Sequence, residues 1–321
     1  MKLSIIITVY NLEDYLEKCV NSCLAQDIDS ADYEIIVVND GSTDHSQQMA
    51  EALASQHGNV RVINKENGGL STARNAGIDA AKGDYIWFID GDDYIEPNCL
   101  KHLLDRAYTD RLDVLCFNLK KIYPDGSQSS DYISHESSGK VYCGAEFIYK
   151  VLMPPSANIA LYNRGYLQSD NLRFYQGLII EDIEFTPRAY SLAKRIEYIN
   201  ECLYYYFQHQ GSIMHSRNFA RRCRSYLTIA DSLHAFTTAH FEKGTETYNA
   251  LMRTAYYSFT ESLNYYTSKA TPLKQYKQSL CYPMDTSITT ARARTKARIA
   301  NFSLRLYIIL SRLQNLFDKK H

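Results

Sequence analysis

Three carboxylates occur within four residues, at Asp90, Asp92 and Asp93, immediately after an apolar run at residues 85–89. Carboxylates packed so closely repel one another and destabilise the fold unless a cation neutralises them. Oxygen ligands without a nearby histidine or cysteine cluster favour Mg²⁺ or Mn²⁺, whose other positions are usually filled by substrate phosphates and water. An acidic turn that caps the next helix accounts for the same residues without any function. Taken alone, the pattern leaves both interpretations open.

Two further segments could contact a nucleotide. Asp40 follows an apolar run at residues 34–39, where a carboxylate could accept hydrogen bonds from a base or a ribose, or could cap a helix. Asn67, Gly68 and Gly69 precede a helical pattern that contains Arg74. Backbone amides after such a glycine pair can face a phosphate, and an arginine adds a bidentate charge. A plain connecting turn with a solvated arginine is the alternative.

These residues must be positioned by alternating strands and helices. Apolar, strand-like runs occupy residues 4–10, 34–39, 60–64, 85–89 and 113–119, and helical spacing of apolar residues occupies 12–26, 45–56, 71–80 and 100–108. Such alternation with short links predicts an α/β fold with a mostly parallel central sheet and helices on both faces. Ligands bind such sheets at the carboxyl ends of the strands, where Asp40 and Asp90 are both expected.

The later sequence is less regular. Residues 121–215 include a turn at 124–126 and a tyrosine-rich strand candidate at 201–209, and from about residue 217 the pattern is helical. We therefore expect three parts, at 1–120, 121–215 and 216–321, of which the last is a helical C-terminal extension with a basic amphipathic end.

Composition narrows the setting. The net charge of −1 predicts no global attraction to nucleic acid or membrane, and none of the eight cysteines forms a C-x-x-C pair, so we expect free thiols rather than a zinc site. The N-terminus lacks the features of a signal peptide, and no stretch reaches the ~18 apolar residues that a spanning helix needs. These features predict a cytoplasmic protein whose contact with a membrane would be peripheral.

Four segments together resemble the inverting family 2 glycosyltransferases of GT-A fold, of the type that builds bacterial surface polysaccharide or lipopolysaccharide. They are the runs Ser-Ile-Ile-Ile-Thr-Val-Tyr-Asn at 4–11, Val-Asn-Asp-Gly-Ser-Thr-Asp at 38–44, Asn-Gly-Gly-Leu-Ser-Thr-Ala-Arg-Asn-Ala-Gly at 67–77, and Gly-Asp-Tyr-Ile-Trp-Phe-Ile-Asp-Gly-Asp-Asp at 83–93. The resemblance extends to about residue 215. It implies that residues 1–120 form the nucleotide-sugar-binding half and residues 121–215 the acceptor-binding half. It implies transfer of a sugar from a nucleotide-diphosphate donor, with UDP the default nucleotide, to a hydroxyl of a glycan or lipid-linked saccharide.

The resemblance also implies roles for single residues. Thr8, Val9 and Tyr10 would lie against the base, and Asp40 would hold it. Asp90 would lie near the ribose, and Asp92 would be the main ligand of Mn²⁺ or Mg²⁺ in an Asp-x-Asp motif. The catalytic carboxylates would be Glu181 and Asp182, with Asp182 as the general base. Without the resemblance, this pair is only an acidic first turn of a helix. We group these residues as catalytic Asp182 and Glu181; donor-binding Thr8, Val9, Tyr10, Asp40, Gly69, Arg74, Asp90 and Asp92; and metal-binding Asp92 and Asp90.

One segment departs from the family pattern. Members often carry an arginine just before a Gly-Ser-Ile sequence, whereas here residues 208–210 are Gln, His and Gln. His209 could contact the metal or the diphosphate, or it could be an ordinary polar loop residue.

Other classes fit less well. A nucleotidyltransferase or a dinucleotide-dependent dehydrogenase should carry a glycine-rich signature after the first strand, and residues 10–14 contain no glycine. A catalytically degenerate nucleotide-sugar or glycan-binding module of the same fold remains an alternative. The intact acidic segments favour the enzyme.

The C-terminal residues 290–321 combine cations with apolar residues at helical spacing. The apolar positions are Ile299, Phe302, Leu306, Ile309, Leu310, Leu313 and Leu316, and the only acid is Asp318. The pattern predicts a basic amphipathic helix. It could bind an anionic membrane surface, or its apolar face could pack on the protein's own body or on a second copy in a homodimer.

Overall fold

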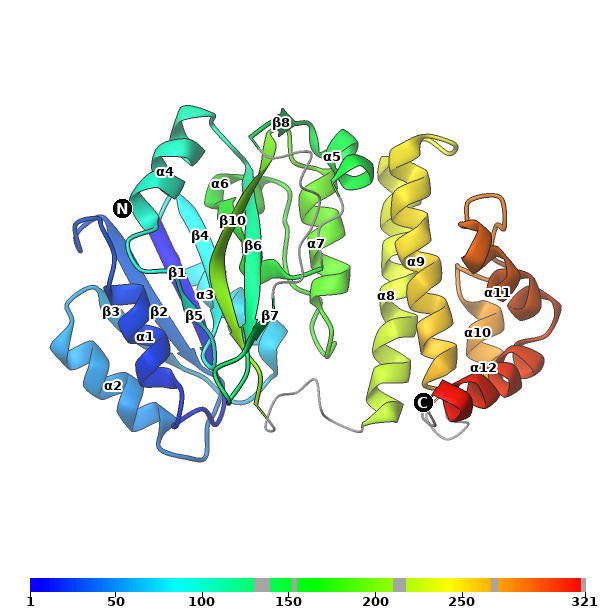
Figure 1. Ribbon diagram of the computed structural model, residues 1–321, viewed down its shortest axis with the longest axis horizontal. Coiled ribbons are helices and arrows are strands. Elements are labelled where there is room, and N and C mark those ends of the chain that lie inside the picture. The colour runs from blue at the N-terminus through cyan, green and yellow to red at the C-terminus, as the bar shows by residue number, and fades with distance from the viewer. Residues whose placement is uncertain (130–138, 152–154, 210–217, 267–270, 319–321) are drawn as a thin grey trace. The chain divides into compact units, whose positions relative to one another are not determined.

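The computed structural model describes residues 1–129, 139–151, 155–209, 218–266 and 271–318. The chain forms two compact units, which we call the sheet unit (Met1–Gly177 with Phe185–Ser212) and the helical unit (Leu178–Glu184 with Ile213–His321). Figure 1 shows the elements of both units.

The sheet unit is built on one mixed sheet whose principal strand order is β3-β2-β1-β4-β9-β6-β10-β5. Strands β1 to β4 pair in parallel, β6 pairs in parallel with β10, and β9 is antiparallel to both of its neighbours. The strands are β1 (Leu3–Val9), β2 (Tyr33–Asn39), β3 (Val60–Asn64), β4 (Tyr85–Asp90), β5 (Tyr94–Ile95), β6 (Val114–Ile122), β7 (Gln128–Ser129), β8 (Val141–Tyr142), β9 (Ala160–Asn163) and β10 (Ile196–Phe207).

Helices cover both faces of this sheet, which is why its central strands β1 and β2 are buried at every position rather than at alternate ones. Ile5 of β1 packs in a core that includes residues of α1, α2 and α4, whereas its neighbour Ile6 packs in a second core with residues of α3, α5, α6 and α7. The helices are α1 (Leu16–Leu24), α2 (Ser46–Gln56), α3 (Leu70–Ala80), α4 (Leu100–Thr109), α5 (Gly144–Lys150), α6 (Arg164–Ser169) and α7 (Asp182–Ser191), the last of which crosses into the helical unit. The predicted α/β fold is confirmed.

Helix α1 begins later than the apolar spacing at 12–26 predicted. Asn11 has a positive φ of 55°. The amides that follow it bond to the loop after β2 and to the start of α2: Glu13 N–H donates to Asp44 Oδ2 at 3.1 Å, and Leu12 N–H to Ser46 Oγ at 2.8 Å. These tertiary hydrogen bonds hold residues 11–13 in a turn, so the helix begins only at Leu16.

The helical unit contains α8 (Phe219–His240), α9 (Glu246–Asn264), α10 (Leu273–Gln278), α11 (Ala291–Phe302) and α12 (Leu304–Asp318). Side-chain oxygens cap three of these helices at their N-termini, from Asn218, Thr245 and Thr290. A core formed by residues of α8 to α12 joins them. The predicted helical C-terminal extension is confirmed.

The prediction of one amphipathic helix at the C-terminus is wrong, because the chain forms two helices there, α11 and α12. Ser303 is extended (φ −158°, ψ 113°), and its side chain accepts a hydrogen bond from Leu306 N–H at 3.2 Å, which caps the start of α12. Residues 319–321 and the side chains of 315–318, including Leu316, lie outside the described part. No helix in the described ranges is long and apolar enough to cross a membrane.

Candidate active site

The acidic turn predicted to carry chemistry lies at the carboxyl end of β4, next to the end of β1. Gly91 N–H donates to Thr8 O at 3.0 Å, and a Cβ on Gly91 would come within 2.9 Å of that oxygen. Glycine is therefore required for the turn to approach β1 so closely. This approach places the carboxylates of Asp90, Asp92 and Asp93 at the strand ends, as the βα pattern predicted.

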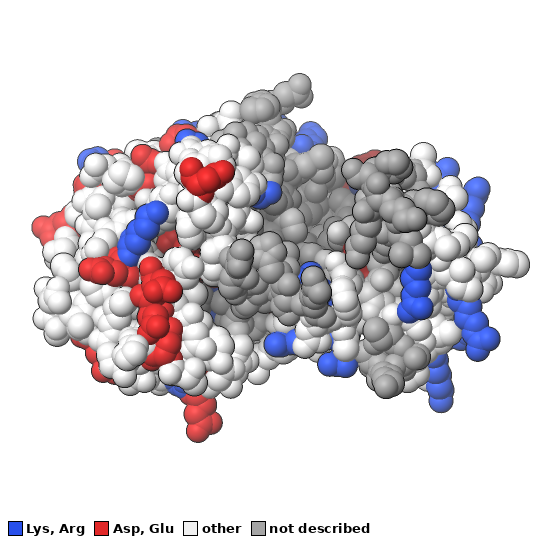
Figure 2. Space-filling model, turned by 60° about the horizontal axis from the view of Figure 1, so that its bottom comes forward, with Lys and Arg blue, Asp and Glu red and all other residues white. Residues whose placement is uncertain are grey.

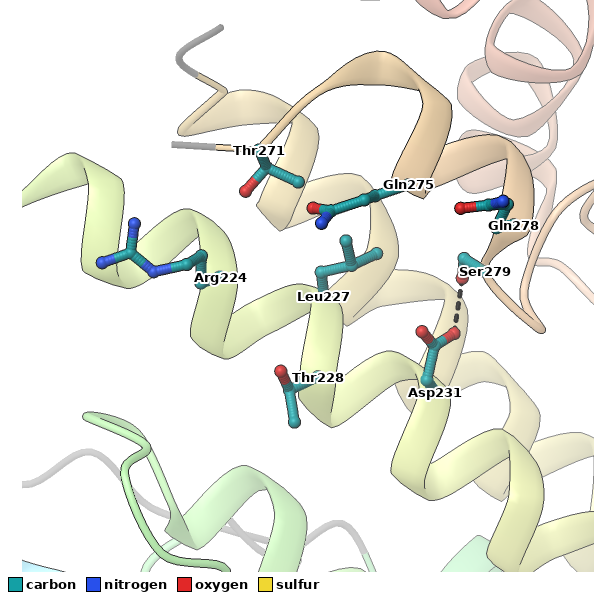
Figure 3. A pocket seen from close by; sticks show the side chains of 8 residues that line it. All are labelled: Arg224, Leu227, Thr228, Asp231, Thr271, Gln275, Gln278 and Ser279. Carbon is teal, nitrogen blue, oxygen red and sulfur yellow. Dashed lines mark hydrogen bonds between the residues drawn. The ribbon is translucent and has the colours of Figure 1, made fainter. Parts of the chain in front are cut away.

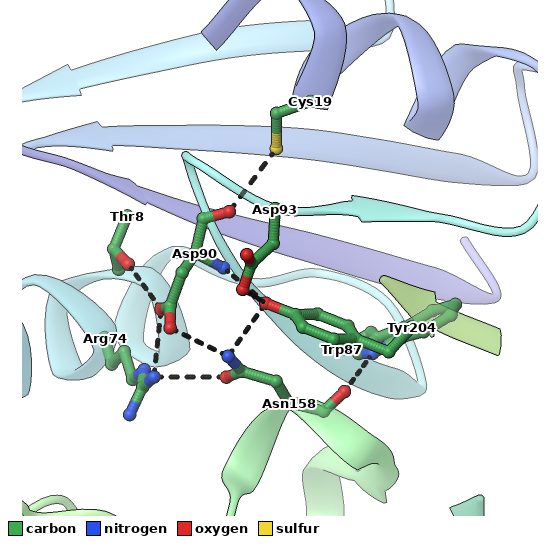
Figure 4. A network of polar contacts seen from close by, with 8 residues as sticks. All are labelled: Thr8, Cys19, Arg74, Trp87, Asp90, Asp93, Asn158 and Tyr204. Atoms are coloured by element: carbon green, nitrogen blue, oxygen red, sulfur yellow. Dashed lines mark hydrogen bonds and ion pairs between the residues drawn. The ribbon is translucent and has the colours of Figure 1, made fainter. Parts of the chain in front are cut away.

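Asp90 is the centre of a polar network (Figure 4). Its Oδ1 accepts hydrogen bonds from Arg74 Nη2 at 3.0 Å and Thr8 Oγ1 at 3.3 Å, and its Oδ2 accepts one from Asn158 Nδ2 at 2.8 Å. Arg74 is only 1% exposed, whereas the Asp90 side chain is 29% exposed. A buried arginine needs such a partner, so Arg74 holds Asp90 in place. The predicted contact of Arg74 with a phosphate stays a prediction beside this structural role.

Asp93 is the buried anchor of the turn. Its carboxylate accepts hydrogen bonds from Tyr204 Oη and from Phe207 N–H, both of β10. Burial, followed by repulsion from Asp92 and Asp90, raises the pKa of Asp93 well above its ordinary value. The Tyr204 hydroxyl also accepts hydrogen bonds from Asp90 N–H and Asn158 Nδ2. This one tyrosine of β10 therefore bonds to the carboxylate of Asp93 and to the backbone of Asp90.

The side-chain partner of Asp92 among the described residues is His209. His209 Nε2 lies 2.8 Å from Asp92 Oδ2, with 18% of the Asp92 side chain and 9% of the His209 side chain exposed. Burial and then the charge of Asp90 raise the pKa of Asp92, although the hydrogen bond to His209 opposes this. Asp92 therefore carries negative charge that the surrounding protein compensates incompletely.

The donor set fits a hard divalent cation. Asp92 offers carboxylate oxygens, whereas both oxygens of Asp90 already accept hydrogen bonds. Within the described ranges, no three His, Cys, Asp or Glu side chains gather so that they could hold a metal ion. A cation bound at Asp92 would therefore take most of its ligands from phosphate oxygens and water, as Mg²⁺ usually does.

Asp40 and the glycine turn form a second cluster at the ends of β2 and β3. The buried Asp40 carboxylate accepts from Lys65 Nζ at 2.5 Å, Gly68 N–H at 3.0 Å and Gly69 N–H at 2.7 Å. Gly69 has a φ of 87°, which favours glycine. The amides expected to face a phosphate thus bind a carboxylate of the protein itself. The contact of Asp40 with a base, and that of Gly69 with the donor, remain predictions.

The first strand presents its three predicted base contacts differently. Val9 is 1% exposed and packs in the core, and Thr8 is buried and donates to Asp90. Tyr10 is 48% exposed. Of these three side chains, only that of Tyr10 is open to a ligand in this structure.

The predicted catalytic pair lies on a segment of the helical unit. Asp182 is the first residue of α7, and Glu181, which precedes it, is 4% exposed. The segment is fixed to α8, because Ser232 Oγ donates to Glu184 Oε1 at 2.7 Å and Ile179 N–H donates to Ser225 Oγ at 3.3 Å. The side chains of Leu178, Ile180 and Ile183 pack with the core of the same unit.

The helical unit also contains a pocket of about 380 Å³ between α8 and the segment around α10 (Figure 3). Its lining is mostly polar, with Arg224 at one end, and Ser279 Oγ donates to Asp231 at the other. All of its lining residues belong to the helical unit, and none belongs to the carboxylate network.

Sequence reasoning did not single out several residues of the site. Lys65 directly follows β3, and its place at the same edge of the sheet as Asp40 could have been inferred from the strand pattern. Tyr204 lies in the tyrosine-rich strand that was expected, but nothing marked it among its neighbours. Asn158 lies in a short 3₁₀ turn (Ala157–Ile159), and no motif in that segment points to a site.

The sequence is similar to known glycosyltransferases. The sequence model of "Glycosyl transferase family 2" matches residues 4–170. EpsJ of Bacillus subtilis (strain 168), named an uncharacterized glycosyltransferase, is 34% identical over 219 residues, which are 66% of this chain and 62% of EpsJ. Glycosyltransferase GlyG of Streptococcus pneumoniae serotype 4 is 30% identical over 224 residues, 66% of this chain and 72% of GlyG. The chain thus spans less than two thirds of EpsJ.

A solved structure shares the fold over nearly the whole chain. Residues 1–349 of Staphylococcus aureus TarS, in complex with UDP-GlcNAc, match with a TM-score of 0.75 and 20% identity, covering 98% of this chain and 92% of that one. At this identity the likeness concerns the fold, and it supports the GT-A type expected from the sequence.

Proposed function

Because the chain belongs to glycosyl transferase family 2, we propose that it moves one sugar from a nucleotide-diphosphate donor to a hydroxyl of a glycan or a lipid-linked saccharide. The observation that carries the proposal is the Asp92 carboxylate, held at the end of β4 with its charge incompletely compensated. A UDP-sugar is the proposed donor, supported by the UDP-GlcNAc bound to TarS.

Asp92, with Asp90 beside it, would hold Mn²⁺ or Mg²⁺. When bound, such a cation stabilises the negative charge that develops on a departing diphosphate. The protein's own contribution is rigidity: Arg74, Asn158 and Tyr204 fix the carboxyl end of β4 through buried hydrogen bonds. A preorganised site of this kind needs no rearrangement when the substrate reacts.

Asp182 is proposed as the general base that removes the proton from the acceptor hydroxyl as that oxygen attacks the sugar. Its place in the first turn of α7 stabilises a negative charge, and the anchoring of the segment to α8 limits its movement. The proposed reaction is a single displacement, which inverts the anomeric centre. His209, whose Nε2 lies 2.8 Å from Asp92 Oδ2, would lower the pKa of the Asp92 carboxyl through this contact.

A thermal-shift screen of nucleotide sugars, with and without Mn²⁺, tests the donor site. A ligand that binds the native state raises the melting temperature, so one nucleotide sugar should stabilise the protein only when Mn²⁺ is present. Stabilisation by no nucleotide sugar would overturn the proposal. Stabilisation without any release of the nucleotide would instead identify a degenerate binding module of the same fold.

A further inference from the structure

Helix α12 carries apolar side chains on two opposite sides. One set, at positions 304, 307 and 308, is buried in the core of the helical unit. The other set, at 306, 309, 310 and 313, has the same spacing but faces outward. The two sets are offset by two residues, which is about 200° around a helix of 3.6 residues per turn. The outer side of α12 is therefore as apolar as the side that packs.

Together with the end of α11, this outer side forms what we call the outer apolar face. Its exposed fractions are high for large apolar residues: Phe302 84%, Leu306 39%, Ile309 56%, Leu310 42% and Leu313 47%. Single exposed apolar residues are ordinary on protein surfaces, but four on successive turns of α12, with Phe302 at the end of the preceding helix, are not. Such an exposed apolar side indicates a surface that another partner covers.

Cations accompany this face. Arg298 is exposed on α11 and Arg305 on α12, and in the part of the chain that is described neither lies within 4.0 Å of a carboxylate. Residues 291–317 contain no aspartate or glutamate. Figure 2 shows Lys and Arg side chains at the end of the helical unit that carries these helices.

We propose that the outer apolar face docks on an anionic lipid surface, with its apolar side chains at the acyl boundary and Arg298 and Arg305 among the headgroups. An interfacial helix combines these two features, apolar residues on one side and cations on its flanks. The proposal is independent of glycosyl transfer, although it would bring the enzyme to a lipid-linked acceptor.

Charge complementarity favours lipid over a second copy of the chain. A two-fold dimer would press the same face of each copy together. The arginines of both copies would then approach each other, and neither pair of helices offers a carboxylate in residues 291–317 to neutralise them. An anionic surface neutralises the arginines and covers the apolar side chains at the same time.

Sedimentation of the full chain with vesicles tests the proposal. We expect binding to phosphatidylcholine vesicles that contain phosphatidylglycerol, weaker binding at high salt, and little binding to phosphatidylcholine alone. Replacing Phe302 and Ile309 by serine should weaken the binding by about tenfold or more for each residue. Arg298→Gln with Arg305→Gln should weaken it roughly 25-fold, about fivefold per cation.

Matched controls lie elsewhere on the surface. Leu280 is 54% exposed outside this face, so Leu280→Ser should leave vesicle binding unchanged. Lys82→Gln with Lys194→Gln removes the same number of charges from exposed positions of the sheet unit and should also have no effect. All replaced residues are exposed, so the variants should fold.

Three results would overturn the proposal. The first is equal sedimentation with anionic and neutral vesicles. The second is binding that neither the serine pair nor the glutamine pair reduces. The third is a dimer in analytical ultracentrifugation that the Phe302→Ser and Ile309→Ser replacements dissociate, without vesicle binding by the parent protein.

Discussion

Replacing Arg74 by methionine should destabilise the sheet unit strongly, although Arg74 was predicted from the sequence as a donor-binding residue. Arg74 is 1% exposed and lies 3.0 Å from Asp90 Oδ1 and 3.1 Å from Asn158 Oδ1. Methionine keeps much of the packing against Phe174 but leaves the Asp90 carboxylate without its cation. Breaking a buried pair costs 3–5 kcal/mol, and because Asp90 is partly exposed we expect the lower end, about 3 kcal/mol.

Differential scanning calorimetry measures this loss. A free-energy change of about 3 kcal/mol lowers the melting temperature of a unit of this size by roughly 6–12 °C. Arg173→Met is the matched control, because Arg173 pairs with Asp79 on the surface, with side-chain exposures of 32% and 66%, and such pairs contribute about 1 kcal/mol or less. Adding Asp90→Asn to Arg74→Met should recover part of the loss. An unchanged melting temperature, combined with loss of donor-induced stabilisation, would refute the structural role and assign Arg74 to the ligand.

Three other replacements test neighbouring parts of the account. Because the folded-state pKa of Asp92 is raised, the ionised carboxylate destabilises the metal-free protein, and Asp92→Asn should raise the melting temperature at pH 7. A pH series should show this gain vanish below about pH 4, where the aspartate is protonated in both the folded and the unfolded protein. Asp182→Asn should retain donor-induced stabilisation yet lower turnover by about 10²–10⁴-fold, whereas an inactive Glu181→Gln beside an active Asp182→Asn would reverse the two roles. Ser232→Ala removes the hydrogen bond to Glu184 and should lower the unfolding free energy by about 1 kcal/mol in a urea titration; an unchanged midpoint would show that the bond contributes nothing.

The central strands could be predicted from the sequence because they are buried on both faces. In β1 and β2 every residue is buried, so consecutive apolar residues mark the middle of each strand, at 5–7 and 35–38. Strand β9 was not predicted, since four residues are too few to show a period, and its antiparallel pairing with β4 and β6 depends on the rest of the sheet. The start predicted for α1, at residue 12, was wrong for a related reason: the competing hydrogen bonds are accepted by Asp44 and Ser46, about thirty residues further along the chain.

The residues of the candidate site could be predicted only where a recognisable motif directly follows a predicted strand. Asp90 and Asp92 were found because the acidic turn directly follows β4. The partners of Asp90 were not, because Asn158 and Tyr204 lie 68 and 114 residues further along the chain and only the folded sheet brings them to it. The close contact between His209 and Asp92 likewise depends on where β10 ends.

The segment of Glu181 and Asp182 adds a point that the sequence did not suggest. These residues fall within the range 121–215 that was expected to form an acceptor-binding half, yet residues 178–184 pack with the helical unit. The sequence pattern cannot show that these residues belong to a different unit from the residues around them. Apolar side chains at 178, 180 and 183 would have the same spacing in either core. The roles assigned to the halves remain predictions.

Release of UDP from the donor found by thermal shift, measured with a coupled assay in the presence of Mn²⁺ and an acceptor, tests the central claim most directly. We expect turnover by the parent protein, its loss on adding EDTA, and its loss in Asp92→Asn, with Asp105→Asn as the control because Asp105 is an exposed carboxylate on α4. Undiminished release by Asp92→Asn, or release that is indifferent to EDTA, would contradict the assignment of Asp92 as the metal-holding carboxylate of a glycosyltransferase.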